Sequence, residues 1–221
     1  MKARIASLVG KWKEILLLLA LFMVHTLTIA LVWNFSRQPS YIPALFVLAL
    51  ALIALAIYVA YRLGLWKKKA DGSFLEATAY VVLGTIVLFG VKLIGGQLIV
   101  WEGSGIPENQ ALLQNGHLPP LLLGVLIVGI APFVEELLFR GLLMGRIFGK
   151  DSLSGLLVSS VLFGLVHGPT TPASWFLYGG MGLVLGLAYR LSGRYSCSVL
   201  IHLINNLFGF LMILLLQMLM Q

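Results

Sequence analysis

Residues Ile15–Trp33 read ILLLLALFMVHTLTIALVW, a run without any charged side chain. About 20 consecutive apolar residues in a helix are enough to span the hydrocarbon core of a bilayer. Four basic residues precede the run, Lys2, Arg4, Lys11 and Lys13. No small-residue cleavage site follows it, as one would after a secretory signal. We therefore interpret the run as an uncleaved first transmembrane helix.

Six further apolar segments follow along the chain. Their approximate ranges are 41–63, 75–101, 120–150, 153–167, 175–189 and 197–220. A polar stretch rich in Gly and Pro, 102–119, separates the third and fourth spans. The segment Gly168–Pro172 interrupts the helix between the fifth and sixth spans. We predict an all-α membrane protein of about seven transmembrane helices, with the active site inside the helical bundle.

The composition supports this fold class and excludes others. Of the 221 residues, 60% are hydrophobic and 10% are charged, whereas an ordinary soluble domain is about 45–50% apolar and about 25% charged. A soluble globular enzyme and a disordered chain are both excluded. The net charge of +7 is attributed to cytoplasmic loops rather than to a nucleic-acid partner. The single cysteine, Cys197, cannot form an intrachain disulfide.

The distribution of basic residues predicts the orientation in the membrane. Thirteen of them lie before the first span or around the second, fourth and sixth loops, whereas Arg37 alone lies on the other side. The positive-inside rule then places the N-terminus in the cytoplasm and the C-terminus outside. Lys92 lies inside the third span, near enough to its outer end to extend its ammonium to the interface. We expect no functional role for it.

Two adjacent carboxylates lie within the fourth span, and ionisable side chains inside a membrane mark functional sites by default. Glu136 and Arg140 are four residues apart, so they share a helix face and can form an ion pair. Glu135 is rotated from them by about 100° and is free to face another helix. Because one arginine needs only one carboxylate, the second carboxylate favours a functional role over a purely structural one.

Two histidines and an asparagine lie on later spans. His167 ends the fifth span, and His202 and Asn206 are four apart on the seventh. Each of them alone is typical of a contact between packed helices. At 1.5 Å per residue from the cytoplasmic helix ends, Glu135 and His167 lie at roughly 22 Å, Asn206 at roughly 18 Å and His202 at roughly 12 Å. These overlapping depths predict that the four groups meet in one site.

These residues form three motifs, Glu135-Glu136-x-x-x-Arg140, Phe163-x-x-x-His167 and His202-x-x-x-Asn206. In this order, on separate spans, they resemble the CPBP family. It comprises CAAX-processing endopeptidases of the Ras-converting type and bacterial relatives linked to bacteriocin processing and self-immunity (Abi proteins). The resemblance covers roughly residues 118–214, which we expect to form the catalytic transmembrane domain. Residues 1–110 would be accessory transmembrane helices, and the bacterial relatives favour a bacterial cell membrane.

The resemblance implies an intramembrane glutamic endopeptidase without a cofactor or metal. Glu135 and His167 would activate the attacking water, and His202 with Asn206 would stabilise the oxyanion. The architecture of the site would depend on three other residues of these motifs, Glu136, Arg140 and Phe163. The substrate would be a membrane-embedded peptide or protein. A prenylated CAAX tail and a bacteriocin leader are both compatible with these residues.

Two alternatives stay open at this point. Glutamate and two histidines can also ligate zinc, as in a zinc-dependent membrane protease, although the helical H-E-x-x-H signature is absent. A protein of another class, either a non-catalytic bacteriocin self-immunity protein or a proton-coupled carrier, would also contain buried Glu and His. No inverted repeat supports a carrier, and an intact motif set argues against a purely binding role.

Overall fold

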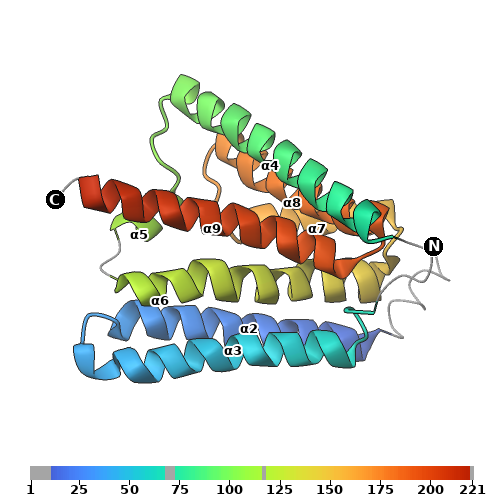
Figure 1. Ribbon diagram of the computed structural model, residues 1–221, viewed down its shortest axis with the longest axis horizontal. Coiled ribbons are helices and arrows are strands. Elements are labelled where there is room, and N and C mark those ends of the chain that lie inside the picture. The colour runs from blue at the N-terminus through green and yellow to red at the C-terminus, as the bar shows by residue number, and fades with distance from the viewer. Residues whose placement is uncertain (1–10, 68–72, 116–117, 220–221) are drawn as a thin grey trace.

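The computed structural model describes residues 11–67, 73–115 and 118–219, and within these ranges every regular element is a helix. The elements in chain order are α2 (Trp12–Phe35), η1 (Pro39–Tyr41), α3 (Ile42–Arg62), α4 (Phe74–Glu102), α5 (Glu108–Asn115), α6 (Pro120–Gly124), η2 (Val125–Glu135), η3 (Leu137–Gly149), α7 (Leu153–Leu165), α8 (Pro172–Ser192) and α9 (Tyr195–Leu219). Most of the long helices run along one axis of the bundle (Figure 1). The fold class is therefore all-α, as predicted.

Three consecutive elements, α6, η2 and η3, form one helix, Pro120–Gly149, which we call the central helix. It lies between α2 and α3 on one side and α9 on the other (Figure 1), and it also packs against α7. Buried residues make up 56% of its most apolar segment, compared with 6% for α4. A polar side chain on the central helix is therefore surrounded by other helices rather than by lipid.

The central helix is wound more widely than an α-helix through η2 and η3. In this π-helical winding an N–H bonds to the carbonyl five residues earlier, and such turns are frequent at functional sites. Pro132 lies inside η2 and has no N–H, so it cannot donate to the carbonyl of Ile127. The side chain of Asn206 donates to that carbonyl instead, with 2.9 Å between Nδ2 and O.

Within the described residues, seven helices of 13 residues or more overlap the seven ranges expected as spans. Five are long and apolar enough to cross a bilayer: α2, η1 with α3, α4, the central helix and α9. The 13 residues of α7 extend over about 20 Å, less than the hydrocarbon core of about 30 Å. The expected loop 102–119 contains a short helix, α5, that the polar composition did not predict. The membrane fold is confirmed, and length and composition support five of the seven expected crossings.

α7 and α8 pack closely at Gly182 and Gly186 of α8, which are four residues apart. A Cβ atom at Gly182 would lie 2.8 Å from the carbonyl oxygen of Ser160, and one at Gly186 would lie 2.5 Å from Leu156 Cδ1. Only glycine fits this close approach without a shift of the neighbouring helix. The same contact brings the Gly182 carbonyl toward the interior of the bundle, where it takes part in the site described below.

Basic side chains join neighbouring elements at the end of the bundle where α2 begins. Lys11 Nζ donates to the Arg146 carbonyl at 2.8 Å, and Arg146 donates to the carbonyl of Leu63. Arg194 Nη2 donates to the Ser73 carbonyl at 3.1 Å. α9 ends at the opposite end of the bundle (Figure 1). These basic side chains therefore gather at one end of the bundle, as the predicted orientation requires. The side of the membrane that each end faces stays a prediction.

Candidate active site

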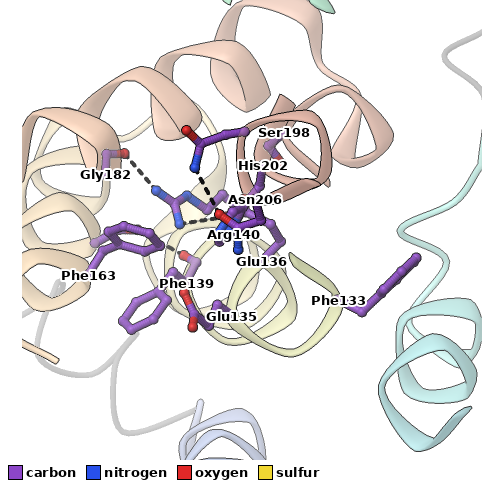
Figure 2. A network of polar contacts seen from close by, with 12 residues as sticks. Phe133, Glu135, Glu136, Phe139, Arg140, Phe163, Gly182, Ser198, His202 and Asn206 are labelled. Carbon is purple, nitrogen blue, oxygen red and sulfur yellow. Dashed lines mark hydrogen bonds and ion pairs between the residues drawn. The ribbon is translucent and has the colours of Figure 1, made fainter. Parts of the chain in front are cut away.

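Three ionisable side chains from the central helix and α9 form one buried cluster. Arg140 Nη1 lies 2.9 Å from Glu136 Oε1, and His202 Nδ1 lies 3.0 Å from the same oxygen. The exposed fractions of the three side chains are at most 2%. Figure 2 shows these side chains converging between the helices. We call Glu136, Arg140 and His202 the salt-bridge cluster.

Arg140 has further partners on α7 and α8. Its Nη2 donates to the Gly182 carbonyl at 2.7 Å, and its guanidinium lies over the Phe163 ring at 4.6 Å from the centroid. A buried guanidinium needs several partners because each unpaired N–H costs desolvation free energy. Arg140 therefore ties three helices to one carboxylate. Arg140 was one of the thirteen basic residues from which the orientation was predicted. It lies inside the bundle, however, and does not belong to a cytoplasmic loop.

The proton positions on His202 follow from its partner. Glu136 is ionised because it pairs with Arg140, and a carboxylate only accepts hydrogen bonds. His202 Nδ1 therefore donates to Glu136, which leaves Nε2 for another partner.

Glu135 and His167 form a second, looser pair. Glu135 Oε2 lies 4.0 Å from His167 Nε2, and the exposed fractions of the two side chains are 12% and 14%. His167 Nδ1 donates to the Phe163 carbonyl at 2.7 Å, and its ring stacks on Tyr178 with 4.8 Å between centroids. Within the described ranges, Glu135 Oε2 is buried and has no hydrogen-bond partner. We call these two residues the Glu135–His167 pair.

Asn206 lies in a separate chain of hydrogen bonds. Its Nδ2 donates to the Ile127 carbonyl, and its Oδ1 accepts from Asn205 Nδ2 at 2.8 Å. Asn205 Oδ1 in turn accepts from Lys92 Nζ at 3.0 Å. Lys92 therefore turns inward to a side chain of α9, and the expectation that its ammonium extends to the interface is wrong. Among the described contacts, Asn206 has no hydrogen bond to the other predicted site residues.

A metal centre would need several ligand side chains directed at one ion. In the part of the chain that the structure describes, no three His, Cys, Asp or Glu side chains converge as ligands for one ion. Both histidines of the motifs have their Nδ1 atoms engaged with oxygen partners. The absence of a metal stays a prediction, which a chelation experiment tests.

Parts of this chain are similar to known proteins. A family model described as type II CAAX prenyl endopeptidase, Rce1-like, matches residues 117–208. The UPF0177 protein YxdF of Lactococcus lactis is 32% identical over 71% of this chain and 89% of its own length. The membrane-embedded CAAX protease MroQ of Staphylococcus aureus is 28% identical over 61% of this chain, and the putative membrane peptidase YdiL of Bacillus subtilis is 29% identical over 58%.

The chain belongs to the CPBP family. This membership supports a membrane peptidase. The chain spans about half the length of MroQ and YdiL (52% of each). No solved structure matches it.

All seven residues predicted from the motifs of the CPBP family fall within residues 117–208. Their catalytic roles, and the division of the chain into accessory and catalytic parts, stay predictions. The structure adds three residues that the motifs did not indicate as part of the site: Tyr178, Asn205 and Lys92. Lys92 could have been recognised from the sequence, because a charge inside an apolar span marks a functional residue by default. Nothing in the sequence distinguished Tyr178 from the other aromatic residues.

Proposed function

We propose that this chain is an intramembrane endopeptidase of the glutamic type, which hydrolyses a peptide bond of a membrane-associated peptide or protein. One observation carries the proposal. Glu136 binds both Arg140 and His202 through Oε1 at 2.9–3.0 Å, whereas the buried Oε2 of its neighbour Glu135 has no hydrogen-bond partner among the described contacts and lies 4.0 Å from His167 Nε2. Buried unsatisfied polar atoms are rare, and a catalytic role is one of the few explanations for them.

The separation of Glu135 Oε2 and His167 Nε2 suits one activated water. A distance of 4.0 Å is too long for a direct hydrogen bond, but one water can contact both atoms at ordinary lengths of about 2.8 Å. The Phe163 carbonyl only accepts, so Nδ1 of a neutral His167 carries the proton and Nε2 accepts. A water that donates to both atoms directs a lone pair away from them, toward a substrate carbonyl.

Hydrolysis then follows general acid–base chemistry. The water oxygen bonds to the carbonyl carbon as Glu135 takes the water proton, and Glu135 returns that proton to the departing amine as the C–N bond breaks. The negative charge that forms on the carbonyl oxygen needs fixed donors. His202 Nε2 supplies one when it carries a proton, because its Nδ1 is engaged with Glu136. Asn206 Nδ2 supplies another through the N–H that does not bond to Ile127.

The substrate class rests on the relatives. The matched family model is described as a CAAX prenyl endopeptidase, and MroQ is named as a membrane-embedded CAAX protease. We infer a CAAX-type or leader-type peptide bond presented at the membrane, because the site lies among helices that themselves cross the bilayer. No metal or cofactor takes part in the proposed reaction.

A cleavage assay on a library of lipid-embedded peptides tests the proposal. The purified full chain is compared with Glu135→Gln and with Glu76→Gln, which removes an exposed carboxylate from the start of α4. We expect the wild type and Glu76→Gln to cleave the same peptides, and Glu135→Gln to cleave none. Equal cleavage by the wild type and Glu135→Gln would overturn the proposed base. A wild type that cleaves no peptide would favour an immunity protein or a carrier.

A further inference from the structure

A continuous chain of hydrogen bonds connects α4 to the proposed oxyanion site. Lys92 Nζ donates to Asn205 Oδ1 at 3.0 Å, and Asn205 Nδ2 donates to Asn206 Oδ1 at 2.8 Å. Asn206 Nδ2 then donates to the Ile127 carbonyl at 2.9 Å. The chain therefore begins at a cation outside the residues that match the family model, 117–208, and ends at the carbonyl to which Pro132 cannot donate.

The chemistry of the two ends fixes the direction of every bond between them. An ammonium has donors and no acceptor, so Asn205 must turn its oxygen toward Lys92 and its NH2 toward Asn206. Asn206 then accepts through Oδ1 and turns its own NH2 away from α4. The Ile127 carbonyl, which only accepts, requires the same direction at the other end. A reversed chain would place donor against donor at Lys92 and oxygen against oxygen at Ile127.

This direction matters because an oxyanion can be stabilised only by the NH2 side of the Asn206 amide. That NH2 group has two N–H donors, of which the Ile127 carbonyl takes one. The second is available to a developing negative charge. Hydrogen bonds to an ionised donor are shorter and stronger than neutral ones, and bonds linked in a chain polarise one another. A cation at the start of the chain therefore strengthens the donor at its end.

The packing of α4 against α9 holds Lys92 at this position. α4 contacts both α8 and α9, and Phe89 of α4 meets Phe208 of α9 edge to face, with 5.1 Å between ring centroids. The Lys92 ammonium lies 5.6 Å from the Phe89 centroid, so the same aromatic ring also supports the cation. A charged side chain inside a membrane span is costly and is retained where it has a function.

We propose that Lys92 is a positioning residue, which acts through Asn205 to orient and polarise the Asn206 amide for the oxyanion. This inference rests on the proposed function, because it assigns α4 a part in the same hydrolysis. It predicts an effect on the chemical step rather than on substrate binding. An oxyanion donor contributes about 10²–10³ in kcat, and loss of its orientation should remove a part of that contribution.

Three variants and one control test the inference through kcat and KM on a cleaved peptide. Lys92→Met keeps an unbranched side chain only one atom shorter and removes the donors, so we expect kcat to fall roughly 10-fold with KM unchanged. Lys92→Arg keeps a cationic donor and should restore most of kcat. Asn205→Asp keeps a partner for Lys92 but has no N–H for Asn206, so it should lower kcat as Lys92→Met does. The control Thr85→Val removes a hydroxyl whose described hydrogen bond is to the Val81 carbonyl within α4, and it should leave kcat unchanged.

A double-mutant cycle separates positioning from a general structural role. In an Asn206→Ala background, Lys92→Met should have no further effect on kcat, because the group that it orients is gone. Additive losses, or wild-type kcat in both Lys92→Met and Asn205→Asp, would overturn the inference while cleavage by the wild type upholds the proposed function. If the wild type cleaves no peptide, both proposals are overturned.

Discussion

The salt-bridge cluster and the Glu135–His167 pair begin at neighbouring residues of one helix, yet they are built differently. In the cluster, Glu136 Oε1 contacts both Arg140 and His202 at 2.9–3.0 Å, and the side chains are almost fully buried. In the pair, Glu135 and His167 are 4.0 Å apart and slightly exposed. A cluster held by short ion pairs resists rearrangement, whereas a pair 4.0 Å apart leaves room for a reactant between its atoms. The difference separates a part of the site that stabilises the helices from a part that is suited to chemistry.

The two carboxylates differ because successive residues on a helix face different neighbours. Glu136 is in register with Arg140, one turn further along, and it faces α9. Glu135 is turned toward the end of α7, where His167 is fixed by the Phe163 carbonyl and Tyr178. Figure 2 shows Glu135 and Glu136 projecting to different sides of the central helix. Four predictions test how far this division of labour holds, and the Lys92 variants add a fifth.

The largest effect is expected for Glu135→Gln. Loss of a general base typically costs about 10²–10⁴ in rate, so turnover should fall to background. The melting temperature in detergent should stay close to that of the wild type, because Glu135 Oε2 has no hydrogen bond to lose among the described contacts. Turnover and melting curves are measured on the same preparations. Near-wild-type turnover would show that the pair is not the reactive part of the site.

Glu136→Gln and Arg140→Ala should lower both stability and activity. Removal of one partner from a buried ion pair leaves an uncompensated charge and typically destabilises by about 3–5 kcal/mol. Glu136→Gln should be the more severe change, because it leaves Arg140 and His202 without their shared carboxylate. In Arg140→Ala, Glu136 keeps His202 as a partner. Chemical denaturation in detergent measures the free energies, and a fully stable but inactive Glu136→Gln would reverse the assigned roles.

A smaller effect is expected for Tyr178, whose ring stacks on His167 at 4.8 Å. Aromatic pairs contribute about 0.5–1.5 kcal/mol beyond burial, so Tyr178→Leu should lower kcat by up to about tenfold through a less well-oriented imidazole. Tyr178→Phe keeps the ring and is the matched control, with activity near that of the wild type. Equal losses in both variants would assign the effect to the hydroxyl instead of the stack.

No effect is expected from metal removal. If Glu135 and His167 activate water directly, the purified protein stays active after exhaustive chelation. The control is a second chelated sample to which zinc is returned, and its rate should equal that of the first. Activity that disappears with the chelator and returns specifically with zinc would favour the metalloprotease alternative and change the role of the pair from base to ligand set.

The sequence by itself determined the spanning helices and the ion pair between Glu136 and Arg140. Continuous apolar runs of about 20 residues require spanning helices, because a backbone is stable in lipid only when its N–H and C=O groups are hydrogen-bonded within the protein. The i, i+4 spacing of Glu136 and Arg140 determined their ion pair, since such neighbours share a face. The motif order was sufficient to identify the family, and the match at residues 117–208 agrees with it.

Only the tertiary structure decided which helix faces meet. Periodicity gives the position of a side chain around its own helix but not the rotation and crossing of its neighbours, so no local pattern predicted that His202 would share the Glu136 carboxylate. For the same reason Lys92 appeared to be an interfacial side chain, although it donates to Asn205 across more than 100 residues of chain. The polar contacts between helices depend on packing, and packing is decided by the whole bundle at once.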